Sequence, residues 1–127
     1  MNSILIGEDD PFIADIYAKS FAKAGFKVDV ANDGRMVLEK ISHNHPDIVA
    51  LDIDFGPGKM NGCEVLKELR SEEKTKNLKV IVLSNYNSDD ITQKYNVDID
   101  SFGIIKHFVK IETPVEEIVK TVKEILK

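Results

Sequence analysis

Residues 46–54 read PDIVALDID, in which four apolar residues, Ile48 to Leu51, run unbroken into the carboxylate of Asp52. A short apolar run without alternation is typical of a strand that is covered on both faces. Such strands are characteristic of parallel sheets flanked by helices. The stretch therefore predicts an inner strand that delivers Asp52 to one end of a parallel sheet.

Similar apolar runs recur on either side of this stretch. They lie at residues 4–6, 28–30, 80–83 and 108–109. Segments with apolar residues at helical spacing lie between them, at residues 13–24, 37–41 and 65–69, and a further one follows the last run, at residues 115–126. This alternation predicts a doubly wound α/β fold, with a five-stranded parallel sheet and helices on both faces. No linker or repeat divides residues 1–127, so we expect one domain.

Two helical segments carry more specific expectations. Between Asn85 and Ile105 only residues 91–95 look helical, which predicts a short or irregular fourth helix. The last helix has Thr113 in position for an N-cap, Pro114 in its first turn and Glu116 placed to complete a capping box.

Composition and charge limit the classes of function. The chain has 127 residues, of which 43% are hydrophobic and 31% charged, and its net charge is −5. This charge argues against direct binding of nucleic acid, whose phosphates attract basic surfaces. No apolar run approaches the roughly 20 residues of a membrane span and no signal peptide opens the chain, so we expect a cytoplasmic protein without membrane association. The single cysteine, Cys63, has no partner for an internal disulfide.

Polar residues follow four of the five expected strands. Glu8, Asp9 and Asp10 follow the first, Asp52 the third and Ser84 the fourth, and Lys110 ends the fifth. In parallel sheets the ligand crevice lies beyond the carboxyl ends of the strands, so we expect these side chains to converge. Clustered carboxylates repel one another and require a cation or protonation. Oxygen ligands of this kind suit Mg²⁺, which binds one or two carboxylates together with phosphate oxygens.

The same residues match the requirements of phosphoryl transfer. That reaction needs a nucleophilic oxygen and neutralisation of the charge on the transferred group. Asp52, a metal, Ser84 and Lys110 supply both. Each also has a structural explanation, with Asp10 as a helix N-cap, Ser84 as a loop cap and Lys110 as a solvated strand end. Their shared position at the strand ends favours the functional explanation.

Four stretches resemble the receiver domain of bacterial and archaeal response regulators. They are ILIGEDDPF (4–12), PDIVALDIDFGPGKMNGCEVL (46–66), KVIVLSN (79–85) and HFVKIETPVEEIV (107–119), and the resemblance spans essentially the whole chain. It implies a flavodoxin-like (CheY-like) fold with strand order 2-1-3-4-5. It also implies a two-component signalling protein rather than an enzyme, one that promotes its own Mg²⁺-dependent phosphorylation and dephosphorylation.

The resemblance implies a role for each site residue. Asp52 is similar to the phosphorylated aspartate, and Glu8 and Asp9 to the acidic pair, with Asp9 as the direct Mg²⁺ ligand. Ser84 is similar to the hydroxyl residue that bonds the phosphoryl group, and Lys110 to the lysine that pairs with that group.

Two further positions follow from the resemblance. The backbone carbonyl of Asp54 is similar to the third protein ligand to Mg²⁺. His107 occupies the place of the aromatic residue that turns inward when the hydroxyl residue is drawn to the phosphoryl group. A histidine here is either a usable switch or a polar strand residue.

Several features depart from the family pattern. Residues 55–59 make the loop after Asp52 about two residues longer than usual. Asn85 replaces a small residue, and the Asp54 carboxylate adds a negative charge that either repels phosphate or orients water. Ile111 stands where a proline usually follows the lysine.

The expected partners also come from the resemblance. A sensor histidine kinase or a phosphotransfer protein would supply the phosphoryl group, and a downstream effector protein would receive the signal. Output would run through the surface formed by the fourth helix, the fifth strand and the last helix. The same surface is a candidate for homodimer contact.

Other functions fit parts of the sequence. One is a receiver-like interaction module that works without phosphorylation. Another arises because Asp52-Ile53-Asp54 resembles the nucleophile motif of haloacid-dehalogenase-type phosphatases, in which the second aspartate protonates the leaving group. The acidic cluster precedes this motif rather than following it, which disfavours a phosphatase. A flavin site is disfavoured because residues 7–11 would repel a phosphate.

Overall fold

The structure, a computed structural model that describes residues 1–127, contains one five-stranded sheet. The strands are β1 (Ser3–Gly7), β2 (Lys27–Ala31), β3 (Ile48–Leu51), β4 (Lys79–Ser84) and β5 (Lys106–Val109). All are parallel and lie in the order β2-β1-β3-β4-β5. The expected doubly wound α/β fold with strand order 2-1-3-4-5 is therefore confirmed.

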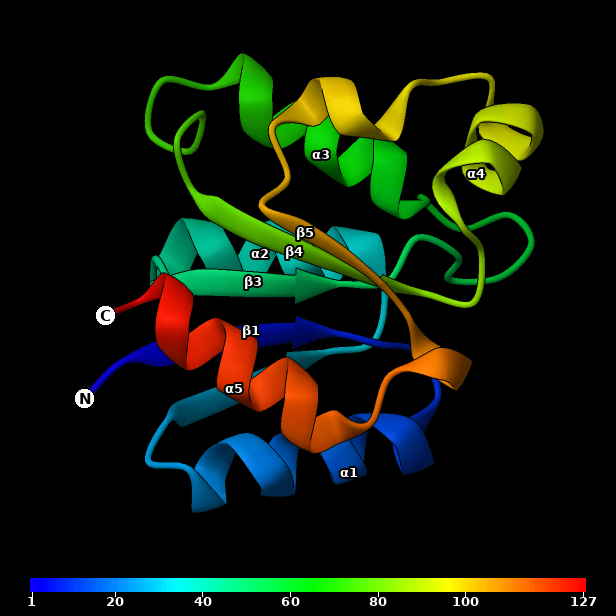
Figure 1. The fold of residues 1–127 in the computed structure, drawn as a ribbon. Coiled ribbons are helices and arrows are strands. Elements are labelled where there is room, and N and C mark those ends of the chain that lie inside the picture. The colour runs from blue at the N-terminus through cyan, green and yellow to red at the C-terminus, as the bar shows by residue number, and fades with distance from the viewer.

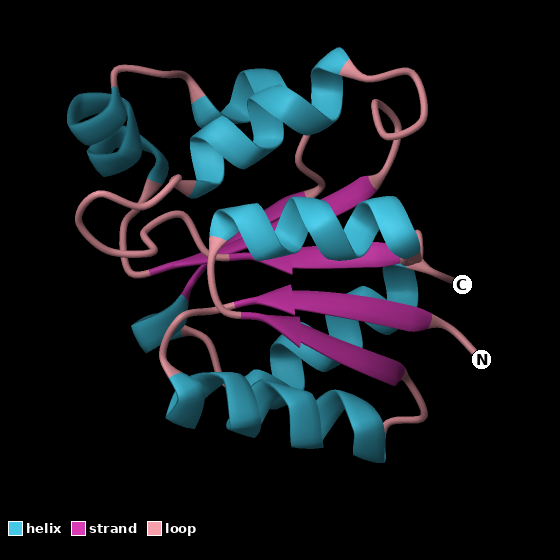
Figure 2. Ribbon diagram, turned by 180° about the vertical axis from the view of Figure 1, so that it is seen from behind, coloured by secondary structure: helices cyan, strands magenta, loops and turns pink.

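Helices cover both faces of this sheet. They are α1 (Pro11–Lys23), α2 (Gly34–His43), α3 (Gly62–Ser71), α4 (Ser88–Tyr95) and α5 (Val115–Ile125), with the short 3-10 helices η1 (Ile99–Phe102) and η2 (Lys110–Glu112) on either side of β5. Helices α1 and α5 lie on one face, and α2 and α3, with α4 beside them, lie on the other (Figures 1 and 2). None of the helices combines the length and apolar character that a membrane crossing demands.

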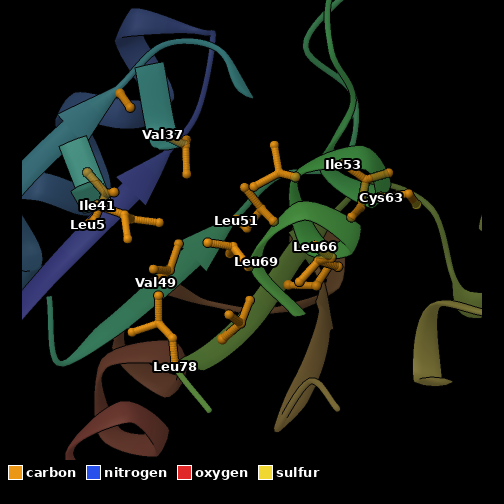
Figure 3. Close-up of a cluster of buried hydrophobic side chains, with 14 of the residues drawn as sticks. Leu5, Val37, Ile41, Val49, Leu51, Ile53, Cys63, Leu66, Leu69 and Leu78 are labelled. Atoms are coloured by element: carbon orange, nitrogen blue, oxygen red, sulfur yellow. The ribbon is translucent and has the colours of Figure 1, made fainter. Parts of the chain in front are cut away.

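Alternating strand side chains fill two apolar cores, one beneath each helical layer. On β1, Ile4 and Ile6 belong to the core under α1 and α5, whereas Leu5 belongs to the core under α2 and α3. Figure 3 shows the second core, where Leu66 and Leu69 of α3 contribute. Every residue of β3 is 0% exposed, because this strand is central and covered on both faces. That position explains its unbroken apolar sequence.

The parallel register brings the carboxyl ends of the inner strands to one edge of the sheet. Gly7 pairs with Leu51, and Leu51 pairs with Val82. Glu8 and Asp52 therefore leave neighbouring strands side by side, and the Asp52 amide donates to the Gly7 carbonyl at 3.0 Å. In Figure 1 this edge lies opposite both chain termini.

The last helix begins differently from the expectation. Helix α5 starts after Pro114, and no side chain caps its first turn. The Thr113 hydroxyl donates instead to the Val109 carbonyl at 2.9 Å, because the turn of η2 brings that carbonyl within reach. The expected capping box from Thr113 to Glu116 is therefore wrong.

Helix α4 is short, as expected from the sequence. It has eight residues, of which only Ile91 is buried, and its ends are fixed by a capping box between Asn87 and Asp90 and by Asn96 in a left-handed conformation. A helix with one buried side chain is weakly anchored to the core, so α4 can shift at low cost.

Helix α3 approaches β3 closely at Gly62. The Gly62 amide donates to the Ile53 carbonyl at 2.7 Å. A Cβ at this position would overlap the Asp52 carbonyl oxygen and lie 2.7 Å from the Ile53 Cα. Because these are backbone atoms next to the carboxyl end of β3, they cannot move aside without disturbing the Asp52 segment.

We predict that Gly62→Ala lowers the free energy of unfolding by about 1–3 kcal/mol, because the added methyl group forces α3 away from β3. Urea unfolding followed by circular dichroism measures the change. Lys67→Ala, at an exposed position of the same helix, is the control and should change the free energy by less than about 0.5 kcal/mol. Equal stability of Gly62→Ala and the wild type would contradict a tight contact here.

Candidate functional site

A pocket of about 330 Å³ opens at the carboxyl edge of the sheet. Segments that follow β1, β3, β4 and β5 form its wall. The charged side chains that line it are one ammonium, Lys110, and five carboxylates, Glu8, Asp9, Asp10, Asp52 and Asp54. The pocket is therefore strongly negative in the absence of a bound cation.

The Lys110 ammonium lies between two buried carboxylates. Its Nζ is 2.6 Å from Glu8 Oε1 and 3.0 Å from Asp52 Oδ2. None of the three side chains is more than 8% exposed. Lys110 reaches this position because β5 ends at Val109 and η2 then turns the chain toward the end of β1 (Figure 1). The three charges join the first, third and fifth strands of the fold.

The Asp52 carboxylate is held on both sides. Its Oδ1 accepts the Ile53 amide at 2.7 Å and has a longer contact of 3.5 Å with the Asp54 amide. Its Oδ2 accepts the Lys110 ammonium. A carboxylate fixed in this way presents one orientation to an incoming group, as nucleophilic attack requires.

Glu8, Asp9 and Asp52 can converge on a metal ion. One ligand oxygen from each lies within 4.8 Å of the other two. The Asp10 amide donates to Glu8 Oε2 at 3.2 Å and helps to orient that side chain, while Asp9 is exposed. Carboxylate oxygens are the ligands that Mg²⁺ prefers, and a divalent cation would balance the excess negative charge of the pocket.

Burial shifts the proton affinities of this cluster. Burial raises the pKa of Glu8 to about 7, although the hydrogen bond from Lys110 opposes the shift. Burial also raises the pKa of Asp52, against the attraction of Lys110. Burial alone would lower the pKa of Lys110, but its two carboxylate partners outweigh that effect and raise it. The ammonium therefore stays charged, and Glu8 is the carboxyl group poised to take up a proton.

Ser84 and His107 are not among the residues that line the pocket. Ser84 is fully buried, and its Oγ accepts the Tyr86 amide at 3.1 Å. The His107 Nδ1 lies 3.2 Å from the Ser88 Oγ, while its buried Nε2 has no hydrogen-bond partner. Burial lowers the pKa of His107 and so favours the neutral form of its ring. The structure thus brings Glu8, Asp9, Asp52 and Lys110 together but leaves these two side chains apart from them.

The longer loop after Asp52 folds back onto the core. Phe55 is 4% exposed and joins the core under α2 and α3. Gly56 and Gly58 have φ values of 103° and 75°, which side chains disfavour. These two turns direct Pro57 and Lys59 into solvent. The side chains of the extra residues therefore do not fill the pocket. Asn85, in the loop after β4, lines the pocket and its side chain is exposed.

The rim also contains an ion pair that the sequence did not reveal. Asp54 accepts the Gly56 amide at 2.9 Å through Oδ1 and pairs with the Lys94 ammonium at 3.1 Å through Oδ2. These two contacts lower the pKa of Asp54. Lys94 lies 40 residues further along the chain, on α4, so no local pattern links the two residues.

Known proteins resemble this chain along most of its length. The family model described as response regulator receiver domain matches residues 4–120. Sporulation initiation phosphotransferase F of Bacillus subtilis is 31% identical over 123 residues, which cover 97% of this chain and 92% of that protein. Regulatory protein AtoC of Escherichia coli is 38% identical over 73 residues, which cover 58% of this chain and 15% of AtoC, so the chain spans a small part of that relative's length.

Solved structures agree with the sequence relatives. The response regulator protein TrrA of Thermotoga maritima, in complex with Mg²⁺-BeF, is 31% identical to this chain. The two superpose with a TM-score of 0.79, and the match covers 98% of each chain.

We predict that the metal-free protein loses stability as the pH rises from about 5 to about 8. The folded-state pKa of Glu8, about 7, lies above its ordinary value, so its contribution is fully present below that ordinary value and is lost as the pH rises through 7. The free energy of unfolding, from urea titrations in a chelator, should fall by on the order of 2 kcal/mol.

Two variants test the origin of this pH dependence. Glu8→Gln should flatten the profile, whereas Glu68→Gln, at an exposed position of α3, should retain it. A profile that is flat in the wild type, or equally steep in Glu8→Gln, would contradict the raised pKa of Glu8.

Proposed function

Because the chain belongs to the response regulator receiver family, we propose that Asp52 accepts a phosphoryl group in a Mg²⁺-dependent reaction and that the phosphorylated domain controls a partner protein. Residues 1–127 then act as one cytoplasmic receiver domain of a two-component system. The observation that carries the proposal is the Lys110 ammonium, bonded to Asp52 and Glu8 at the floor of an open acidic pocket.

The surroundings of Asp52 suit this chemistry. One carboxylate oxygen forms the bond to phosphorus while the bond from phosphorus to the donor's leaving group breaks. A bound Mg²⁺ would neutralise the charge that spreads over the phosphoryl oxygens. Its protein ligands in this proposal are Glu8, Asp9, Asp52 and the backbone carbonyl of Asp54. Lys110, already 3.0 Å from the Asp52 carboxylate, then pairs with the transferred group. The complex of TrrA with Mg²⁺-BeF, a phosphoryl mimic, supports a site of this kind.

The donor in this proposal is the phosphohistidine of a sensor histidine kinase or a phosphotransfer protein. Two large apolar side chains are exposed beside the acidic segment and beside Lys110. They are Phe12, 76% exposed, and Ile111, 82% exposed. A protein that brings a histidine to Asp52 would cover both and remove apolar surface from water. Their exposure supports a protein donor.

The response to phosphorylation is assigned to Ser84, His107 and the surface of α4, β5 and α5. To donate to a phosphoryl oxygen, the Ser84 hydroxyl, which accepts the Tyr86 amide, must move toward the pocket. That movement opens space for the partly buried His107 ring to turn inward. The weakly anchored α4 then repacks. The altered surface would bind a downstream effector or a second copy of the domain.

A phosphatase of the haloacid-dehalogenase type fits the site poorly. Its second aspartate must hold a proton to give to the leaving group. Both Asp54 oxygens are already bonded, to the Gly56 amide and to Lys94, and these contacts lower the pKa of Asp54. Asp54 is therefore ionised at neutral pH and has no proton to donate.

We predict that acetyl phosphate with Mg²⁺ adds the mass of one phosphoryl group to the protein and that peptide mapping places it on Asp52. Asp52→Asn should remove the addition, because the amide oxygen is a poor nucleophile, and so should a chelator. Asp15→Asn, at an exposed position of α1, is the control and should leave the addition intact. An unmodified wild type would favour an interaction module that works without phosphorylation.

A second prediction concerns the switch. Beryllofluoride with Mg²⁺ should shift the backbone amide signals of residues 86–107 and of α5, because movement of Ser84 is transmitted to this face. Two-dimensional ¹⁵N spectra with and without the mimic measure the shifts, and Asp52→Asn should show none. Shifts confined to Glu8, Asp9, Asp52, Ser84 and Lys110 would mean that the switch lies elsewhere.

A further inference from the structure

Lys94 joins three separate segments at the rim of the pocket. It extends from α4 and pairs with Asp54 in the loop after β3 at 3.1 Å. The same Nζ lies 3.3 Å from the Tyr86 hydroxyl, in the loop after β4, and 4.8 Å from the centre of the Tyr86 ring. Figure 1 shows α4 beside both of these loops at the carboxyl edge of the sheet.

The excess negative charge of the pocket makes the Lys94–Asp54 pair relevant to the approach of a phosphodonor. A phosphodonor is an anion, and it must pass the rim to reach Asp52. Lys110 is committed to two carboxylates at the floor, Glu8 and Asp52. The rim carboxylate of Asp54 would repel the donor if it were left unpaired. Lys94 is the cation that bonds to Asp54, and it adds positive charge at the mouth.

We infer that Lys94 is a positioning residue for the phosphodonor: by pairing with Asp54 it cancels the repulsion at the rim and lowers the donor concentration needed for half-maximal phosphorylation. This inference rests on the proposed function of Asp52. Lys94 does not touch the reacting atoms, so it acts on the approach of the donor and not on the maximal rate. The pair is 45% and 38% exposed, so salt should weaken its effect.

The test is the rate of phosphorylation as a function of acetyl phosphate concentration, at saturating Mg²⁺ and low salt, read by intact mass. Lys94→Gln should raise the half-saturating concentration by about two- to fivefold, the range of an exposed ion pair, with little change in the maximal rate. Lys94→Arg should restore it. Added salt should reduce the difference between Lys94→Gln and the wild type. Phosphoramidate, which carries less negative charge than acetyl phosphate, should show a smaller effect.

Asp54 supplies the decisive comparison. In an Asp54→Asn background the repulsive charge is absent, so adding Lys94→Gln should change the half-saturating concentration much less than it does in the wild type. Lys120→Gln removes the same charge from an exposed position of α5 and is the matched control. Circular dichroism of each variant confirms that the fold is retained.

Three results would overturn the inference. The first is a half-saturating concentration in Lys94→Gln equal to that of the wild type. The second is a rise of the same size in the Asp54→Asn background, which would mean that Asp54 is not involved. The third is a fall confined to the maximal rate, which a structural role of Lys94 would produce. A wild type that takes no phosphoryl group would instead refute the proposed function itself.

Discussion

One buried ammonium between two buried carboxylates holds the carboxyl edge of this sheet together. Lys110 bonds Glu8 and Asp52 at hydrogen-bonding distance, away from water. Charges in such a place are costly, and removing one partner leaves the others uncompensated. The arrangement is still short of positive charge, because two carboxylates share one ammonium. The site is therefore built to take up a proton or a cation, and burial, which raises the pKa of Glu8, favours the same outcome.

The positions of the charged residues could be predicted because they depend only on strand order and direction. The apolar run before Asp52 indicates an inner strand, and parallel pairing then brings the ends of β1 and β3 to the same edge. Side-chain contacts at the end of a strand depend on the turn that follows, which the sequence pattern does not specify. For this reason the sequence predicts that Ser84 stands at the end of β4, as observed. It does not predict that the Ser84 hydroxyl faces the Tyr86 amide. The failed cap at Thr113 has a similar cause, since η2 redirects its hydroxyl. No sequence pattern points to Lys94, because only the tertiary fold brings α4 to Asp54.

The segment that contains α4 is only weakly attached to the core. The His107 ring lies next to this helix, with its Nδ1 3.2 Å from the Oγ of Ser88, the first residue of α4. Helix α4 does little to hold this segment in place, because Ile91 is its only buried side chain. Rearrangement of this region therefore costs less than in the centre of the sheet, where every residue of β3 is 0% exposed.

The separation of 102 residues between Glu8 and Lys110 also bears on how the chain is made. Synthesis on the ribosome proceeds from the N-terminus, so β1 and β3 emerge well before β5. The strands that carry Glu8 and Asp52 can pair early, but their carboxylates lack the compensating ammonium until the edge strand β5 has docked. An unfinished chain therefore has the acidic residues without the lysine that completes the site. Completion of the charge cluster is thus coupled to docking of the edge strand, because Glu8 and Asp52 gain the Lys110 ammonium only at that step.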